Sequence, residues 1–193
     1  MSAFELYFGL GLDHILDLNG YDHILFVIAL SCVYSLQQWK GVLGMITAFT
    51  IGHSITLALA TFDIIPLDSA LVEFLIPVTI VITAVSNLFT SSEEKSGKWK
   101  VNIYYAGFFG LIHGMGFSNY LRSLLGGEES IVLPLFAFNI ALEVGQIIIV
   151  AIFLIITLIL TRVFSVPSRI WKIIVSLVVA AVGVSLALDA VYW

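Results

Sequence analysis

Six long apolar runs constrain the fold of this 193-residue chain more than any other feature. A helix that crosses the hydrocarbon core of a bilayer needs about 20 apolar residues. The runs cover residues 21–37, 42–62, 69–91, 101–124, 131–161 and 171–191. Charged residues make up only 11% of the chain, whereas soluble domains carry about 25%. We therefore predict an all-α, polytopic transmembrane helix bundle that forms a single domain over residues 1–193.

The N-terminal stretch, residues 3–18, differs from these runs because it is short and carries several charges, Glu5 and Asp13 among them. It ends at Asn19-Gly20, which is a strong turn signal. We predict a short helix packed on or into the outer side of the bundle, which gives seven helices in total. A seventh span is the alternative.

Basic residues are distributed unevenly between the two ends of the predicted bundle. Cytoplasmic loops carry the excess of Lys and Arg. Six spans place seven of the eight basic residues at one end, namely Lys40, Lys95, Lys98, Lys100, Arg162, Arg169 and Lys172. We therefore expect a bacterial inner or plasma membrane protein with both termini outside. We therefore expect the lipid bilayer as a partner. We expect no nucleic acid, because the sequence has no stretch in which basic and aromatic residues alternate as a nucleic-acid surface requires. The sequence leaves open whether the protein forms a homo-oligomer.

All four histidines lie inside or against apolar segments, each beside a polar or small residue. They occur as Asp13-His14, Asp22-His23, Gly52-His53 and His113-Gly114. Ionisable groups at membrane depth are costly and usually mark function. The alternative is four separate core histidines, each hydrogen-bonded to a neighbouring helix. The predicted topology, however, brings the polar groups of several helices to the outer half of the bilayer, which separate core histidines would not require.

The fifth apolar run carries one polar stripe, because Asn139, Glu143 and Gln146 follow the i, i+4, i+7 spacing of one helix face. Such a stripe must face protein or a water-filled cavity. Imidazoles combined with carboxylates suit Ni, Zn, Cu or Fe(II). The predicted metal ligands are Asp13, His14, Asp22, His23, His53, His113 and Glu143, with Ser54, Glu73, Asn139 and Gln146 in supporting positions. Adjacent helical residues diverge by about 100°, so we expect each aspartate to orient a histidine of another helix or to bind metal itself.

Five short motifs follow one another along the chain. They are Gly20 to Phe26 with Asp22-His23, Phe49 to Leu57 with His53, Val72-Glu73, Phe109 to Phe117 with His113, and Phe138 to Gln146 with Glu143. Their residues and their order resemble those of the HupE/UreJ membrane proteins. This family is generally described as nickel permeases or accessory proteins of hydrogenase and urease maturation. The resemblance implies a metal-handling role for Asp22, His23, His53, His113 and Glu143.

Two functional classes use these residues. A permease for nickel or another divalent metal would bind its cargo at the outer half of the bilayer and release it inward. An intramembrane metalloenzyme, a hydrolase or a redox enzyme with one or two metals, would instead use Glu143 as a general base, with Ser54 beside His53. Its other catalytic residues are unknown from the sequence. A metal that only holds the helices together ranks third, because the supply of ligands exceeds the four that a closed site uses.

Overall fold

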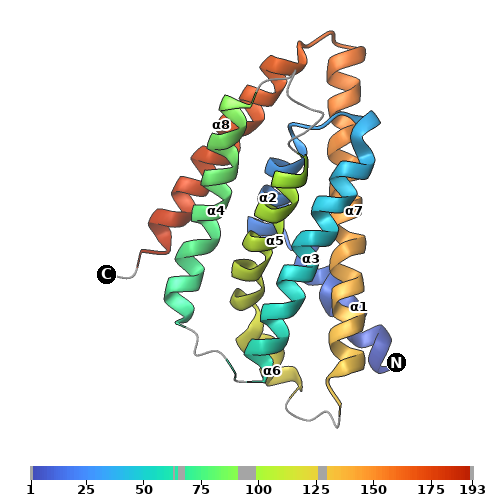
Figure 1. Cartoon of the computed structure of the whole chain (residues 1–193), viewed down its shortest axis with the longest axis vertical. Helices are drawn as coiled ribbons and strands as arrows, with labels where there is room; N and C mark the ends of the chain where they lie inside the picture. Colours follow the sequence, from blue (N-terminus) through green and yellow to red (C-terminus); the bar gives the residue numbers. More distant parts are fainter. Residues whose placement is uncertain (1, 63, 65–67, 91–98, 126–129, 192–193) are drawn as a thin grey trace.

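The computed structural model describes residues 2–62, 64, 68–90, 99–125 and 130–191, and these form an all-helical bundle without strands (Figure 1). The helices are α1 (Ala3–Leu16), α2 (Asp22–Ser31), the short 3-10 helix η1 (Leu36–Gln38), α3 (Trp39–Thr61), α4 (Ser69–Phe89), α5 (Trp99–Gly116), α6 (Ser118–Leu125), α7 (Val132–Arg162) and α8 (Ser168–Asp189). The described part of the chain thus holds eight α-helices, one more than the seven predicted.

Four of the predicted spans are confirmed as long apolar helices. The helical segments Leu36–Thr61, Ser69–Phe89, Val132–Arg162 and Ser168–Asp189 are long and apolar enough to cross a membrane. Helix α7 has 31 residues, which corresponds to about 46 Å at 1.5 Å per residue. It is therefore longer than the hydrocarbon core, which is about 30 Å thick.

The predicted span 21–37 is not one continuous helix. Helix α2 has 10 residues and ends where the side chain of Asn87 donates a hydrogen bond to the carbonyl oxygen of Ala29, at 2.7 Å. That carbonyl would otherwise accept from an amide one turn later in the helix. A contact with α4 therefore ends α2 half-way, and the chain continues as an irregular segment into η1.

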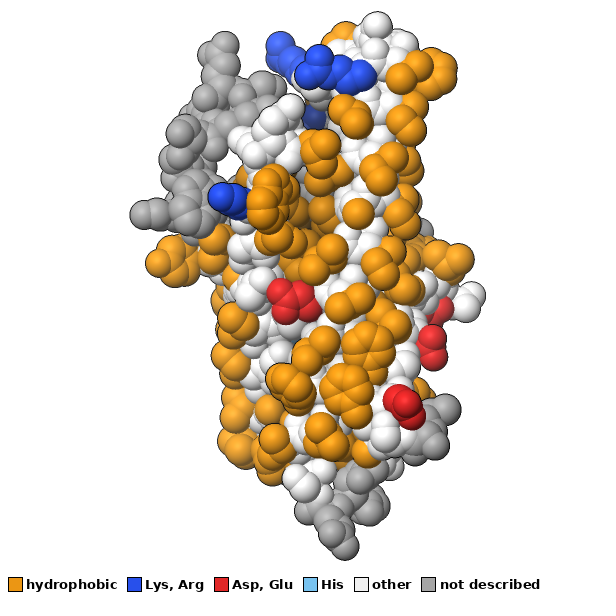
Figure 2. All heavy atoms as spheres, turned by 90° about the vertical axis from the view of Figure 1, so that its right-hand side faces the viewer, with side chains coloured by type: hydrophobic (Ala, Val, Ile, Leu, Met, Phe, Trp, Pro, Cys, Tyr) orange, Lys and Arg blue, Asp and Glu red, His pale blue; other side chains and the backbone are white. Residues whose placement is uncertain are grey.

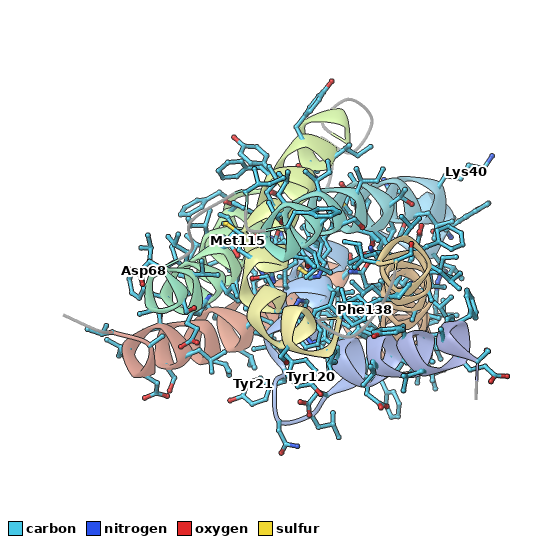
Figure 3. The ribbon with its side chains drawn as sticks, turned by 90° about the horizontal axis from the view of Figure 1, so that it is seen from below. Tyr21, Lys40, Asp68, Met115, Tyr120 and Phe138 are labelled. Atoms are coloured by element: carbon cyan, nitrogen blue, oxygen red, sulfur yellow. The ribbon has the colours of Figure 1, made fainter. Side chains whose placement is uncertain are left out.

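The predicted span 101–124 is likewise divided, into α5 and α6. The break follows two glycines, Gly114 and Gly116, and the hydroxyl of Ser118 donates to the carbonyl oxygen of Met115 at 2.7 Å. Glycine is a poor helix former, and such side-chain bonds compete with the helical pattern. The short helix α6 lies across the lower end of the bundle, where Figure 3 shows it from below with Tyr120.

Helices α3 and α5 approach each other closely because glycines face backbone carbonyls across their interface. A Cβ atom added to Gly52 would collide with the carbonyl oxygen of Gly107. The same holds for Gly110 against Phe49 and for Gly114 against His53. Small residues at this spacing let membrane helices pack backbone to backbone. This packing holds the histidine-bearing stretches of α3 and α5 side by side.

Helix α1 packs on the lower half of α7 (Figure 1). A Cβ atom on Gly11 would lie 2.6 Å from the carbonyl oxygen of Phe138, and one on Gly145 would collide with Ile15. The helix begins with a capping box, in which Ser2 and Glu5 each accept a hydrogen bond from the other's backbone amide. The close contact fixes the end of α1 that carries His14.

On the face that Figure 2 shows, the charges of the described residues separate along the bundle axis. Figure 2 shows Lys and Arg side chains near the upper end of one face, Asp and Glu side chains from mid-height downward, and hydrophobic side chains over most of the rest. Two basic residues used for the orientation, Lys95 and Lys98, lie outside the described residues. The separation agrees in direction with the predicted asymmetry.

Candidate metal centre

The four histidines come from four different helices and converge on one place. His23, at the start of α2, lies centrally, because the centre of its ring is 4.7 Å from that of His14, 5.9 Å from that of His53 and 5.1 Å from that of His113. The rings of His14 and His53 are 6.3 Å apart. Four separate core histidines would not form such a cluster.

One carboxylate joins the cluster. Asp22, His23 and His113 each offer a ligand atom, and these atoms lie within 4.8 Å of one another. Both imidazoles are buried, whereas the side chain of Asp22 is 28% exposed. Two nitrogen donors and a carboxylate oxygen are a ligand set that suits a divalent transition metal.

The hydrogen bond of His23 fixes which of its nitrogens is free. Its Nδ1 lies 3.2 Å from Oδ1 of Asp22, so the N–H at Nδ1 donates to the carboxylate. Asp22 thus bonds to its own neighbour and not to a histidine of another helix, because it stands at the first position of α2 and can bend back. The other alternative, that the aspartate binds metal itself, stays a prediction. The Nε2 atom is buried without a hydrogen-bond partner among the described residues. A carboxylate that orients an imidazole in this way is the usual support of a metal ligand.

Thr79 of α4 orients His113 in the same manner. The Thr79 hydroxyl donates to the carbonyl oxygen of Ile76 at 2.7 Å, so its oxygen accepts the N–H of His113 Nε2 at 3.0 Å. The Nδ1 atom of His113 then keeps its lone pair, and it has no partner among the described residues. Sequence reasoning missed Thr79. The signal was present, because Thr79, Thr83 and Asn87 follow a four-residue spacing on α4.

The other two histidines also carry unpaired nitrogens. His53 is 0% exposed, and neither of its ring nitrogens has a hydrogen-bond partner among the described residues. Nε2 of His14 is also buried and has no hydrogen-bond partner among the described residues. Burial, reinforced by the nearby His23, lowers the pKa of His14 to about 3, so this imidazole is neutral at physiological pH. A neutral imidazole is the form that binds metal.

Aromatic rings surround the cluster and restrict the access of water. The centre of the Phe117 ring lies 3.9 Å from that of the His14 ring. The ring centres of Phe26 and Phe49 lie 4.8 Å and 5.2 Å from that of His113. Phe138, which Figure 3 labels on α7, stacks on Phe117 at 5.1 Å. Such a wall strengthens the electrostatic interaction between a cation and its ligands.

The polar stripe of α7 faces α3, as its spacing predicts, although it pairs with hydroxyl groups. The Thr47 hydroxyl donates to Glu143 at 2.7 Å, and the Thr50 hydroxyl donates to Gln146 at 3.0 Å. Asn139 donates to the carbonyl oxygen of its own helix at Leu135. Glu143 is not one of the residues whose ligand atoms lie within 4.8 Å of one another.

Three further predicted residues lie at the edge of the cluster or away from it. Asp13 is exposed and, with His14, lines a cavity on the outer side of α1. Ser54 donates its hydroxyl hydrogen to the carbonyl oxygen of Thr50 at 2.6 Å. Glu73 is exposed on α4. The structure therefore does not bring these side chains into the three-residue group.

A cavity of about 350 Å³ leads from the surface to Asp22. Its wall includes the carboxylates of Asp22, Glu73 and Asp189, which come from α2, α4 and α8. The sequence analysis did not assign Asp189 to the site, because only the fold brings the end of α8 beside the start of α2. Three carboxylates around one cavity attract cations.

The comparisons with known proteins agree with the sequence motifs. A family model described as HupE / UreJ protein matches residues 1–193. The search of curated proteins found no match, and the search of solved structures found none either.

Proposed function

The chain belongs to the HupE/UreJ family, and from this premise we propose that it is a permease for a divalent transition metal, with nickel as the first candidate. The family is linked to metal transport, and the four long apolar helices agree with an integral membrane protein. Zn, Cu and Fe(II) are the competing cargoes, because imidazole nitrogen accepts all of them. The metal is the transported substrate in this proposal.

One observation supports the proposal above all others: buried, unpartnered imidazole nitrogens gather beside a carboxylate. They are Nε2 of His14, Nε2 of His23, both nitrogens of His53 and Nδ1 of His113. A buried polar atom without a partner costs about 1–3 kcal/mol, and native structures contain few of them. A divalent cation would use several of these lone pairs at once.

We propose that the cation enters from the acidic end. The cavity beside Asp22 collects it, the group of Asp22, His23 and His113 binds it, and His53 and His14 offer the next positions. Glu143 stays in this scheme as a carboxylate that acts after a rearrangement of α3 and α7. Asp13 would attract cations at the second cavity, beside His14.

The proposed topology keeps six crossings and both termini outside. Helix α2 with the irregular segment and η1 forms the first crossing, and α5 with α6 forms the fourth. Transporters often place their substrate at such broken helices, because irregular backbone is tolerated where it lines a cavity. The break after α2 lies about 13 Å from His23, at 1.5 Å per residue.

Uptake into proteoliposomes tests the proposal. Vesicles that contain the purified protein should accumulate nickel faster than protein-free vesicles, and the His113→Ala variant should reduce the rate to background. Equal uptake with and without the protein contradicts a permease. Release of fatty acid or headgroup from vesicle lipids would instead favour the intramembrane enzyme, which the contacts of Ser54 and Glu143 do not favour.

The acidic cavity makes a separate prediction about substrate capture. Glu73→Gln and Asp189→Asn should each raise the nickel concentration at half-maximal uptake about threefold at low salt and leave the maximal rate unchanged. The effect should shrink in high salt, because exposed charges are screened. Asp68→Ser is the matched control, since Asp68 caps α4 but does not line this cavity and serine also caps helices. A lower maximal rate with unchanged half-saturation would contradict this role.

The unpaired nitrogens of His53 predict an unusual effect on stability. In metal-free protein, His53→Leu should leave the free energy of unfolding unchanged or raise it by about 1–2 kcal/mol, because it removes two buried polar atoms without partners. The same variant should transport nickel poorly. Titration with a denaturing detergent measures the stability. A loss of several kcal/mol would show instead that His53 holds the fold together.

A further inference from the structure

Another cavity, of about 500 Å³, lies at the opposite, basic end of the bundle. Its wall is formed by the irregular segment Cys32 to Ser35, by the start of η1, by the last turns of α7 and by the start of α8. The permease proposal does not use it, because a cavity with positive charges is a poor site for a metal cation. Its chemistry therefore points to a different ligand.

Two basic side chains line this cavity, and none of its lining residues in the described part of the chain is acidic. Arg162 ends α7, and Lys172 lies in the first turns of α8 with 9% exposure. Lys172 donates a short hydrogen bond to the carbonyl oxygen of Thr90. Neither residue forms an ion pair with a described carboxylate. The ammonium group of Lys172 is buried, and a buried ammonium without a counter-ion is costly, so Lys172 favours an anion. Arg162 is exposed at the rim of the same cavity and adds a second positive charge.

The start of α8 adds to the positive potential. Ser168 and Pro167 line the cavity, and the helix, 22 residues long, has no side-chain hydrogen bond at its N-cap. The first amide groups of a helix point outward and bind anions, especially phosphate. The N-terminus of α8, the guanidinium of Arg162 and the ammonium of Lys172 thus all line the same cavity.

We propose that this cavity binds the phosphate group of an anionic ligand, and the surroundings identify the source as a membrane phospholipid. Leu36 and Leu158 line the cavity and are 49% and 41% exposed. These apolar side chains offer contacts for acyl chains, which free phosphate lacks. Trp171, which also lines the cavity, is a residue type enriched at the level of the headgroups. Basic pockets between helices at this end of membrane proteins bind anionic headgroups.

Native mass spectrometry of the detergent-purified protein tests the assignment. Phosphatidylglycerol should bind about tenfold more tightly than phosphatidylcholine, and Arg162→Gln and Lys172→Met should each weaken this binding roughly fivefold. Lys40→Gln is the matched control, because Lys40 lies at the same end over the ring of Trp39 and does not line the cavity. Bound metal, measured on the same samples, should not change, so this test is independent of the permease proposal.

A parallel arm with inorganic phosphate distinguishes the two sources. Binding of inorganic phosphate that depends on Arg162, together with equal binding of the two lipids, would support the phosphate site and overturn its assignment to a lipid. Equal binding of the two lipids without phosphate binding would overturn the whole proposal. So would a loss of lipid preference in Lys40→Gln as large as that in Arg162→Gln, since that result would show a diffuse charge effect.

Discussion

Replacing His23 with alanine should lower the affinity of the protein for nickel by about 100-fold or more. His23 is the histidine closest to the others, and its Nε2 is held ready by the bond from Nδ1 to Asp22. Loss of a partner that only orients a ligand already costs about 10- to 100-fold in metal affinity, so loss of the ligand itself costs more. Isothermal titration calorimetry on the purified protein measures the change.

Two variants define what this result means. Thr79→Val should weaken binding by about 10-fold, because His113 keeps its ligand atom but loses its hydrogen-bond partner. Cys32→Ser should leave the affinity unchanged, because Cys32 lies at the other end of α2. A large loss in Cys32→Ser with little loss in His23→Ala would move the metal site away from the histidines.

Gly114→Ala should produce the largest loss of stability. The added Cβ atom would collide with the carbonyl oxygen of His53 and the hydroxyl of Thr56, and a backbone carbonyl cannot move without shifting α3. Overpacking typically costs about 1–3 kcal/mol, and we expect the upper end of that range here. Because the collision lies at His53 itself, nickel affinity should fall as well. Detergent-induced unfolding and metal titration of the same preparation measure both effects.

Gly9→Ala is the matched control for the glycine prediction. A Cβ atom at Gly9 meets nothing within 4 Å, so alanine should be tolerated and should favour α1 slightly. Equal stability of Gly114→Ala and Gly9→Ala would contradict the close packing of α3 against α5.

The sequence predicts the long helices well and the broken ones poorly. Length and hydropathy suffice for α3, α4, α7 and α8, because each is one apolar run with polar ends. They cannot show that 21–37 stops being helical at Ser31, since the cause is a contact with Asn87, far away in the chain. The break between α5 and α6 carries a local signal, because Gly114, Gly116 and Ser118 weaken the helix there.

The candidate site shows the same division. That the histidines meet follows from their rarity and their predicted depth. Which carboxylate meets them does not, because this depends on the rotation of each helix: Asp22 lies inward, whereas Asp13 is exposed and Glu143 bonds to Thr47. The spacing of Asn139, Glu143 and Gln146 predicts that this face of α7 meets polar groups. It does not predict which residues supply them. Asp189 can be assigned only once α8 is placed beside α2, whereas Thr79 is marked in the sequence by its spacing with Thr83 and Asn87.

The central claim is that the converging histidines bind one metal ion together. X-ray absorption spectroscopy of the nickel-loaded protein tests it most directly. A first shell of nitrogen and oxygen atoms, with the multiple-scattering pattern of at least two imidazoles that is lost in the His23→Ala, His113→Ala double variant, is the predicted result. A shell of water oxygens alone, or a sulfur shell, would contradict the account, because the metal would then be held by something other than the converging histidines.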